Sequence, residues 1–243
     1  MSEPSPSWAA ELLAVRSGDR ATTVIPATFR AAGVGAFYVP VVSDFRIDGP
    51  WAFAGLPPLA RAELRRRRRT LIQRASGRVL DLGGVDVSLR PYAGRDDISS
   101  VTVVSPLRSE RIRLLRQARE VGVDLHLALS VPAGGRFDAV VSVARLVTAT
   151  DPDLLARRLL GLVGGDGRLQ AVEPAAAVGL ARRVQRAGAP LSRGVLGVDV
   201  ALDVPELLRR NGWFLSDLHK STVSLTAAPL RTVVDLTARR GPA

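Results

Sequence analysis

Short apolar runs alternate with longer amphipathic stretches along this chain from residue 58 onward. The apolar runs are too short for helices and are typical of strands buried in a parallel sheet. Between them, apolar residues recur at helical spacing among arginines. The pattern predicts strands at 79–82, 101–104, 123–129, 137–143 and 168–172, and helices at 58–76, 109–120 and 151–163. Strands separated by helices of this length indicate βαβ units and an α/β fold with a parallel sheet.

A chain of 243 residues is expected to form one such domain with a modest N-terminal extension. We assign residues 1–57 to the extension and residues 58–243 to the domain. Within the extension, residues 8–15 have helical apolar spacing after a Ser-Pro-Ser start that can cap a helix. Residues 36–57 are rich in Val, Pro, Gly and aromatics, which suits an irregular segment packed on the core. That segment is either structural padding or a lid over a ligand cleft.

Composition excludes several classes of protein. The chain has no cysteine, so disulfides, thiolate metal sites and cysteine nucleophiles are ruled out. Its two histidines, His126 and His219, lack the spacing of a metal site, and no metal is expected. No apolar run approaches the roughly 18 residues of a membrane helix, and the N-terminus lacks the features of a signal peptide. We therefore expect a globular, cytoplasmic protein.

The chain is basic, with 34 Lys and Arg against 23 Asp and Glu, a net charge of +11. Lys220 is the only lysine, and this arginine-rich composition is typical of GC-rich bacterial coding sequence. Most arginines are dispersed, but Arg65–Arg69 form a run within the predicted helix at 58–76. Five consecutive arginines cannot share one helix face, so some must be solvated or pair with acids. A solvated helix is favoured, followed by a surface for an acidic protein or a membrane; nucleic acid is the least favoured partner, and a homo-oligomer stays open.

The stretch at 78–89 begins as a buried strand, reaches Asp81 and continues into the pair Gly83-Gly84. It resembles the first motif of class I S-adenosylmethionine (SAM)-dependent methyltransferases, V-L-D-L-G-x-G-x-G. Residues 137–143 resemble the family's F-D-x-V-V-S-x block, and 151–169 resemble its D-P, helix and G-G-R-L elements. The resemblance covers about residues 60–238 and is closest to the small-molecule, ubiquinone/menaquinone-biosynthesis-like branch. It implies a Rossmann-like fold with helices on both faces, a later helix at 204–213 and a C-terminal antiparallel hairpin that includes 229–234.

The resemblance also implies a cofactor site. The positions that match the family's SAM site are Asp81, Gly83, Gly84, Ser105 and Ser142. Ser142 and Arg145 follow a strand at the carboxyl edge of the sheet, where open α/β sheets bind ligands, so we expect both to face the cleft. Glu173 closes the final parallel strand of the motif block.

Three of the contact points depart from the family pattern. Val85 and Val87 replace two glycines of the first motif. Ser105 stands where the family carries an acid for the ribose hydroxyls, and serine cannot supply a bidentate charged acceptor. The segment 127–132, where an acid commonly meets the adenine, contains none. The sequence therefore combines intact core motifs with degraded ligand motifs.

Two functions follow. One is a SAM-dependent methyltransferase of a small, lipophilic metabolite, with an altered cofactor pocket; such an enzyme mainly positions donor and acceptor. The other is a non-catalytic methyltransferase-like domain, a pseudoenzyme that serves as a binding or regulatory module. The degraded ligand motifs favour the second.

Overall fold

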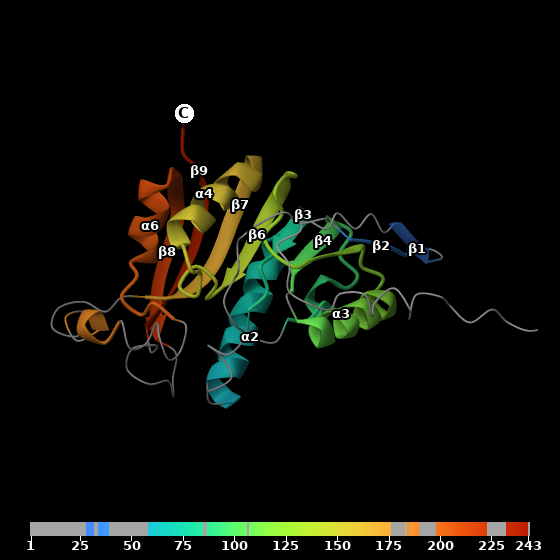
Figure 1. The fold of residues 1–243 in the computed structure, drawn as a ribbon, viewed down its shortest axis with the longest axis horizontal. Coiled ribbons are helices and arrows are strands. Elements are labelled where there is room, and N and C mark those ends of the chain that lie inside the picture. Colours follow the sequence, from blue (N-terminus) through green and yellow to red (C-terminus); the bar gives the residue numbers. More distant parts are fainter. Residues whose placement is uncertain are drawn as a thin grey trace, which may run out of the picture.

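The computed structural model of the chain describes residues 28–31, 34–38, 58–84, 87–105, 107–175, 183, 185–189, 198–222 and 232–242. The predicted helix at 8–15 and all but the first three residues of the predicted lid at 36–57 lie outside these residues, so the proposed domain division stays a prediction. Within the described residues, nine strands form one sheet in the order β1-β2-β5-β4-β3-β6-β7-β9-β8 (Figure 1).

Five consecutive parallel strands form the middle of this sheet: β5 (Leu125–Ala128), β4 (Ile98–Val104), β3 (Gly77–Asp81), β6 (Phe137–Val143) and β7 (Val163–Pro174). A C-terminal hairpin, β8 (Trp213–Thr222) and β9 (Thr232–Arg240), extends the sheet, with β9 antiparallel to both β7 and β8. At the other end, β1 (Thr28–Ala31) pairs antiparallel with β2 (Val34–Tyr38), which runs parallel to β5. The mostly parallel sheet with a C-terminal antiparallel pair confirms the predicted fold class.

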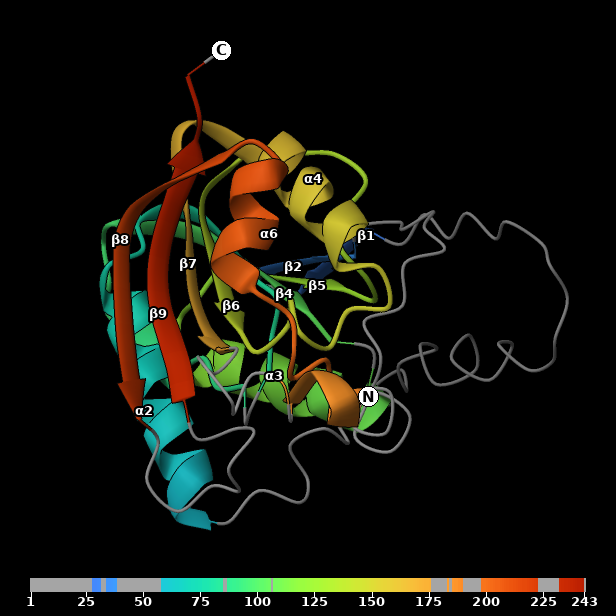
Figure 2. The same cartoon turned by 90° about the vertical axis from the view of Figure 1, so that its left-hand side faces the viewer.

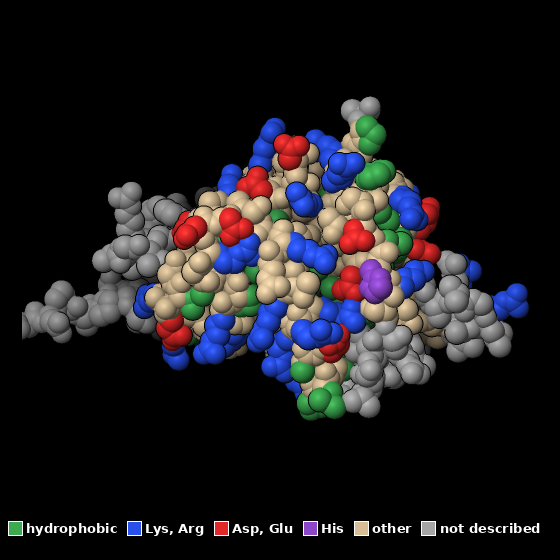
Figure 3. Space-filling model, turned by 180° about the vertical axis from the view of Figure 1, so that it is seen from behind, with side chains coloured by type: hydrophobic (Ala, Val, Ile, Leu, Met, Phe, Trp, Pro, Cys, Tyr) green, Lys and Arg blue, Asp and Glu red, His purple; other side chains and the backbone are tan. Residues whose placement is uncertain are grey.

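Helices cover both faces of the sheet. On one face, α2 (Pro58–Gln73) and α3 (Arg108–Val121) both contact the short 3-10 helix η2 (Arg90–Tyr92). On the other face, α4 (Pro152–Leu162) and α6 (Val204–Arg210) pack together over β7 and β8 (Figures 1 and 2). Figure 3 shows the α2 face, over which Lys and Arg side chains are spread with Asp and Glu side chains between them.

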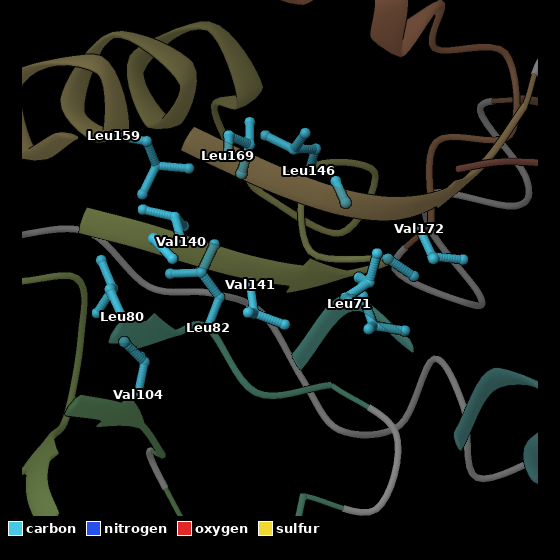
Figure 4. Packing of buried hydrophobic residues seen from close by; sticks show 14 of the residues in the cluster. Leu71, Leu80, Leu82, Val104, Val140, Val141, Leu146, Leu159, Leu169 and Val172 are labelled. Carbon is cyan, nitrogen blue, oxygen red and sulfur yellow. The ribbon is translucent and has the colours of Figure 1, made fainter. Parts of the chain in front are cut away.

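The sheet separates two layers of buried side chains (Figure 4). Towards α4, Leu80 of β3, Val140 of β6 and Leu169 of β7 lie in register and pack below Leu159 of the helix. The opposite layer contains Leu71 of α2 with Val141 and Val172 of the sheet, all of them buried. The apolar runs at 79–82 and 137–143 therefore form strands because both of their faces are covered.

Two features differ from the expected pattern. Residues 164–167 separate the predicted helix at 151–163 from the predicted strand at 168–172, but they lie within β7. The pairing is irregular there, since Val163 pairs with Phe137 and Arg168 pairs with Ala139. A Cβ at Gly167 would lie 2.8 Å from the Phe137 carbonyl oxygen, so only glycine allows this close approach. Between β3 and β4, the described residues 82–84 and 87–97 contain η2 but no α-helix. In its described residues, the first crossover thus has only η2 where a longer helix usually follows the glycine-containing turn in such folds.

Candidate functional site

Charged side chains gather where the parallel strands end, at the carboxyl edge where open α/β sheets bind ligands. Asp81 ends β3, Glu173 lies near the end of β7, and Arg145 follows β6. Three more residues join them from α2, η2 and α3. We call this group of side chains the carboxyl-edge cluster; its members are Arg68, Asp81, Tyr92, Glu110, Arg145 and Glu173.

Asp81 is fully buried and accepts three hydrogen bonds. Its Oδ2 accepts from Arg68 Nη2 and from the Tyr92 hydroxyl, the latter at 2.8 Å, and its Oδ1 accepts from the Gly83 amide at 2.9 Å. Burial and the Asp81 carboxylate raise the pKa of the Tyr92 hydroxyl well above its usual value, so the phenol stays a donor. The Asp81 carboxylate, which the motif resemblance assigns to the cofactor site, therefore has its hydrogen-bond partners within this chain.

The two glycines of the motif keep backbone conformations that other residues adopt rarely. Gly83 has φ +74° and Gly84 has φ +128°, and a Cβ at Gly84 would lie 2.7 Å from the Val143 carbonyl oxygen. A Cβ at Gly83 would lie 3.1 Å from Arg145 Nη2 and 3.4 Å from Val87 Cγ2. Val87 is fully buried, and Val85 lies outside the described residues. The space directly over Gly83 is thus bounded by the Val104 carbonyl oxygen at 3.0 Å, the Arg145 guanidinium and the Val87 side chain.

Arg145 is only 4% exposed, although it carries a charge. Burial lowers the pKa of its guanidinium, while the carboxylates of Glu110, Asp81 and Glu173 oppose that shift. Its Nε has no hydrogen-bond partner among the described residues. The preceding residue, Ala144, has φ +54°, a strained conformation for a residue with a side chain. The turn after β6 therefore directs a buried cation into the cluster at a cost in backbone strain.

Glu173 holds that turn in place. The carboxylate is fully buried and accepts from the Ser142 hydroxyl at 2.7 Å and from the amides of Arg145 (3.0 Å), Leu146 (3.3 Å) and Val147 (3.3 Å). Burial raises the pKa of Glu173 to about 7 despite these hydrogen bonds, which favour the ionised form. Its protonation therefore changes near neutral pH, and its four donors fix the backbone that carries Arg145.

An acid does stand beside the end of β4, although the strand itself supplies only Ser105. The Ser105 hydroxyl is buried and donates to Glu110 Oε2 at 2.5 Å, and Arg111 Nη1 donates to the Ser105 carbonyl oxygen at 3.1 Å. Glu110 comes from the first turn of α3. The sequence analysis missed Glu110 because it considered only the residues at the end of the strand. An acid in the first turn of the following helix was the sequence feature that could have indicated it.

The structure brings together most of the residues that the sequence singles out. Asp81, Gly83, Ser142 and Arg145 all lie at or beside the carboxyl-edge cluster, Ser105 reaches it through Glu110, and Gly84 packs against β6. The histidines do not take part. His126 lies on β5, with its Nε2 3.4 Å from Asp124 Oδ2, and His219 is exposed on β8. The part of the chain that the structure describes contains no group of three potential metal ligands and no helix able to span a membrane.

The arginine run divides between the interior and the surface. Arg68 pairs with Asp81, and Arg67 pairs with Glu63 at 2.9 Å and with Asp235 of β9. Arg65, Arg66 and Arg69 are exposed. Two of the five side chains therefore belong to the fold itself, as expected for a run that cannot share one helix face.

No protein-family model matches the sequence, and the search of curated proteins found no match either. Solved structures do match the fold. The [4+2]-cyclase SpnF is 16% identical, with 75% of this chain and 81% of that chain covered at a TM-score of 0.57. YcgJ from Bacillus subtilis is 12% identical (74% and 100% covered, TM-score 0.56). The N-methyltransferase NodS from Bradyrhizobium japonicum, in complex with S-adenosylhomocysteine (SAH), is 14% identical (80% and 93% covered, TM-score 0.54).

These similarities, together with the strand order, show that the chain has the class I SAM-dependent methyltransferase fold. The resemblance stated from the sequence motifs is confirmed at this level. The ubiquinone/menaquinone-like branch gains no support from these structures.

Proposed function

We propose that this protein is a non-catalytic methyltransferase-like domain that does not hold SAM in the position used by the family. The observation that carries the proposal is the Arg145 guanidinium, whose Nη2 lies 3.1 Å from where a Cβ of Gly83 would be. The family places the methionine portion of SAM against this glycine. The residues present do not fit that portion of the cofactor.

The charges of the cluster support the same conclusion. SAM carries positive charge on its sulfonium and ammonium groups, and the acids at this edge of the sheet would face them. Here the guanidiniums of Arg68 and Arg145 already lie among Asp81, Glu110 and Glu173. Burial raises the pKa of Glu173 to about 7. The buried Asp81 carboxylate already has a cation partner and two further hydrogen bonds, which offset the cost of removing its charge from water. The Arg145 guanidinium thus occupies the position that a cationic ligand would take among these acids.

The local fold offers a second line of support. Nucleotide sites in α/β folds commonly use the N-terminus of the helix that follows the glycine turn. In the described residues between β3 and β4 only the three-residue η2 is present, and Tyr92 of η2 closes onto Asp81. The [4+2]-cyclase SpnF has the same fold, so the fold does not by itself specify methyl transfer.

One observation favours the alternative, an active methyltransferase of a small, lipophilic metabolite. Glu110 supplies a carboxylate next to Ser105, where the family's acid accepts the ribose hydroxyls. In that case Arg145 would have to leave the space over Gly83 before SAM could bind. The alternative therefore requires the Arg145 side chain to turn away from Gly83, on a backbone that Glu173 holds by three hydrogen bonds.

Calorimetry distinguishes the two functions. The natural protein is expected to bind neither SAM nor SAH at millimolar concentrations, whereas Arg145→Ala/Val87→Gly is expected to gain SAH binding because it empties the space over Gly83. Arg119→Ala, which removes an exposed arginine of α3, is the matched control and should gain nothing. Micromolar binding of SAM by the natural protein would contradict the proposal and favour the alternative, an active methyltransferase.

We further propose that the exposed arginines of α2 form the partner surface of the module. Arg65, Arg66 and Arg69 are exposed there, with Arg66 in an ion pair with Glu63 at 2.8 Å, and Leu59 is exposed at the start of the same helix. Their charge suits an acidic protein or an anionic membrane surface.

Co-sedimentation tests the membrane form of this partner proposal. If a membrane is the partner, the protein is expected to bind vesicles of phosphatidylcholine with phosphatidylserine and not vesicles of phosphatidylcholine alone. Arg65→Glu/Arg69→Glu should abolish that binding, and Arg186→Glu/Arg209→Glu, a matched pair of exposed arginines elsewhere, should not. Equal binding by both double variants would contradict a role for α2, and no vesicle binding would assign the surface to an acidic protein.

A further inference from the structure

A hollow of about 730 Å³ lies at the other edge of the sheet, where β7 begins and β9 ends. Its walls include Asp166, Arg168, Phe214, Ser216, Thr237 and Arg239. Its volume is that of a small-molecule site. None of these residues belongs to the carboxyl-edge cluster, so the hollow is independent of the methyltransferase-type ligand site.

Two arginines occupy directly opposite positions on neighbouring strands in this hollow. Arg168 of β7 and Arg239 of β9 are direct partners in the antiparallel register, and both are exposed. Within the described residues neither of them makes an ion pair. Like charges directly opposite on neighbouring strands destabilise a sheet. An anion held between the two guanidiniums would remove that repulsion.

An aromatic side chain continues the row. Phe214 of β8 pairs in register with Arg239, whose guanidinium lies over its ring at 4.9 Å from the ring centre. Phe214 is 47% exposed on the edge strand of the sheet. A large apolar ring with this exposure, with the Arg239 guanidinium over it, offers its uncovered surface for stacking next to an anion site.

The sheet is irregular at the same place. The register between β8 and β9 shifts between Leu215 and Asp217, so Ser216 is the extra residue of a bulge. Its hydroxyl donates to the Thr237 carbonyl oxygen at 3.2 Å. Bulges are over-represented beside binding sites, where they redirect side chains and end regular pairing.

We propose that this hollow binds a small phosphorylated ligand with a planar ring, of the nucleoside diphosphate class. A phosphate group has more acceptor oxygens than a carboxylate and a larger negative charge, so it can accept from both guanidinium forks at once. The ring lies against Phe214, and Asp166 accepts a hydrogen bond from a hydroxyl or amino group of the ligand.

Titration calorimetry at constant ionic strength tests the proposal with three probes: ADP, inorganic pyrophosphate and adenosine. ADP is expected to bind more tightly than pyrophosphate, and adenosine is expected not to bind. Arg168→Gln and Arg239→Gln should each weaken ADP binding about tenfold or more, the loss expected for a charge-assisted hydrogen bond. Phe214→Leu should bring ADP down to the affinity of pyrophosphate, and the control Arg119→Gln should change nothing.

Three results would overturn the proposal: no binding of ADP, equal affinity for ADP and pyrophosphate in the natural protein, or unchanged ADP affinity in Arg168→Gln. Thermal unfolding adds a readout that a merely structural arginine would not give. Without ligand, Arg168→Gln is expected to raise the Tm because it removes the like-charge pair. With ADP, the natural protein should gain more stability than Arg168→Gln does at the same ADP concentration. A lower Tm for ligand-free Arg168→Gln would also overturn the proposal.

Discussion

Replacing Arg68 with methionine is expected to lower the free energy of unfolding by about 3–5 kcal/mol, the usual cost of removing one partner of a buried ion pair. Arg68 and Asp81 are both buried, and the guanidinium also donates to the Ser88 carbonyl oxygen at 3.1 Å. Methionine keeps much of the side-chain length but leaves the Asp81 carboxylate without its cation. Chemical denaturation monitored by circular dichroism measures the change.

Two further variants make this expectation specific. Arg69→Met removes the neighbouring arginine, which is exposed, and should change the free energy of unfolding by less than about 0.5 kcal/mol. Arg68→Met/Asp81→Asn should recover a large part of the loss, because no unpaired charge then remains buried. Equal effects of Arg68→Met and Arg69→Met would show that the Arg68–Asp81 pair does not stabilise the fold.

Glu173→Gln is expected to remove a pH dependence of stability worth up to about 3 kcal/mol. Burial raises the pKa of Glu173 from 4.5 to about 7 in the folded protein. The folded state therefore binds the proton more strongly than the unfolded state does. The contribution of Glu173 is greatest below about pH 4.5 and decreases as the pH rises through about 7.

The readout is the difference between the natural protein and the variant across pH 5 to 8, since other groups titrate in both. The natural protein should lose stability relative to Glu173→Gln as the pH rises over this range. Glu120→Gln, which neutralises an exposed acid of α3, is the control and should follow the natural protein. Parallel stability curves for the natural protein and Glu173→Gln would mean that the pKa of Glu173 is not raised in the folded state.

The sheet was largely predictable because its strands are buried on both faces. The runs at 79–82, 101–104 and 137–143 contain little but apolar residues, and such runs become β3, β4 and β6. The order of the motifs then indicated a parallel sheet with a C-terminal hairpin. Hydrophobic periodicity within a few neighbouring residues is sufficient to predict these strands.

The pairing of charges was not predictable. The run Arg65–Arg69 indicates that some arginines must find acids, but only the rotation of α2 against the sheet selects Arg68 for Asp81 and Arg67 for Asp235. The sequence also did not predict that the described part of the first crossover contains no α-helix. Glu110 was missed because it reaches the end of β4 from the next helix. These contacts depend on tertiary packing, which local sequence does not record.

Arg145 is an intermediate case. Its place after β6 predicted a position at the carboxyl edge, and the side chain is there. Its direction depends on the strained Ala144, on the Glu173 hydrogen bonds and on three carboxylates from separate elements. No pattern within one segment carries that information.

A crystal structure determined after soaking with a high concentration of SAH tests the central claim most directly, because it locates the Arg145 side chain and the ligand together. The account expects the guanidinium over Gly83 among Asp81, Glu110 and Glu173, with no SAH at the carboxyl edge. SAH bound against Gly83, with Arg145 turned away and Glu110 on the ribose hydroxyls, would contradict it and identify an active cofactor site.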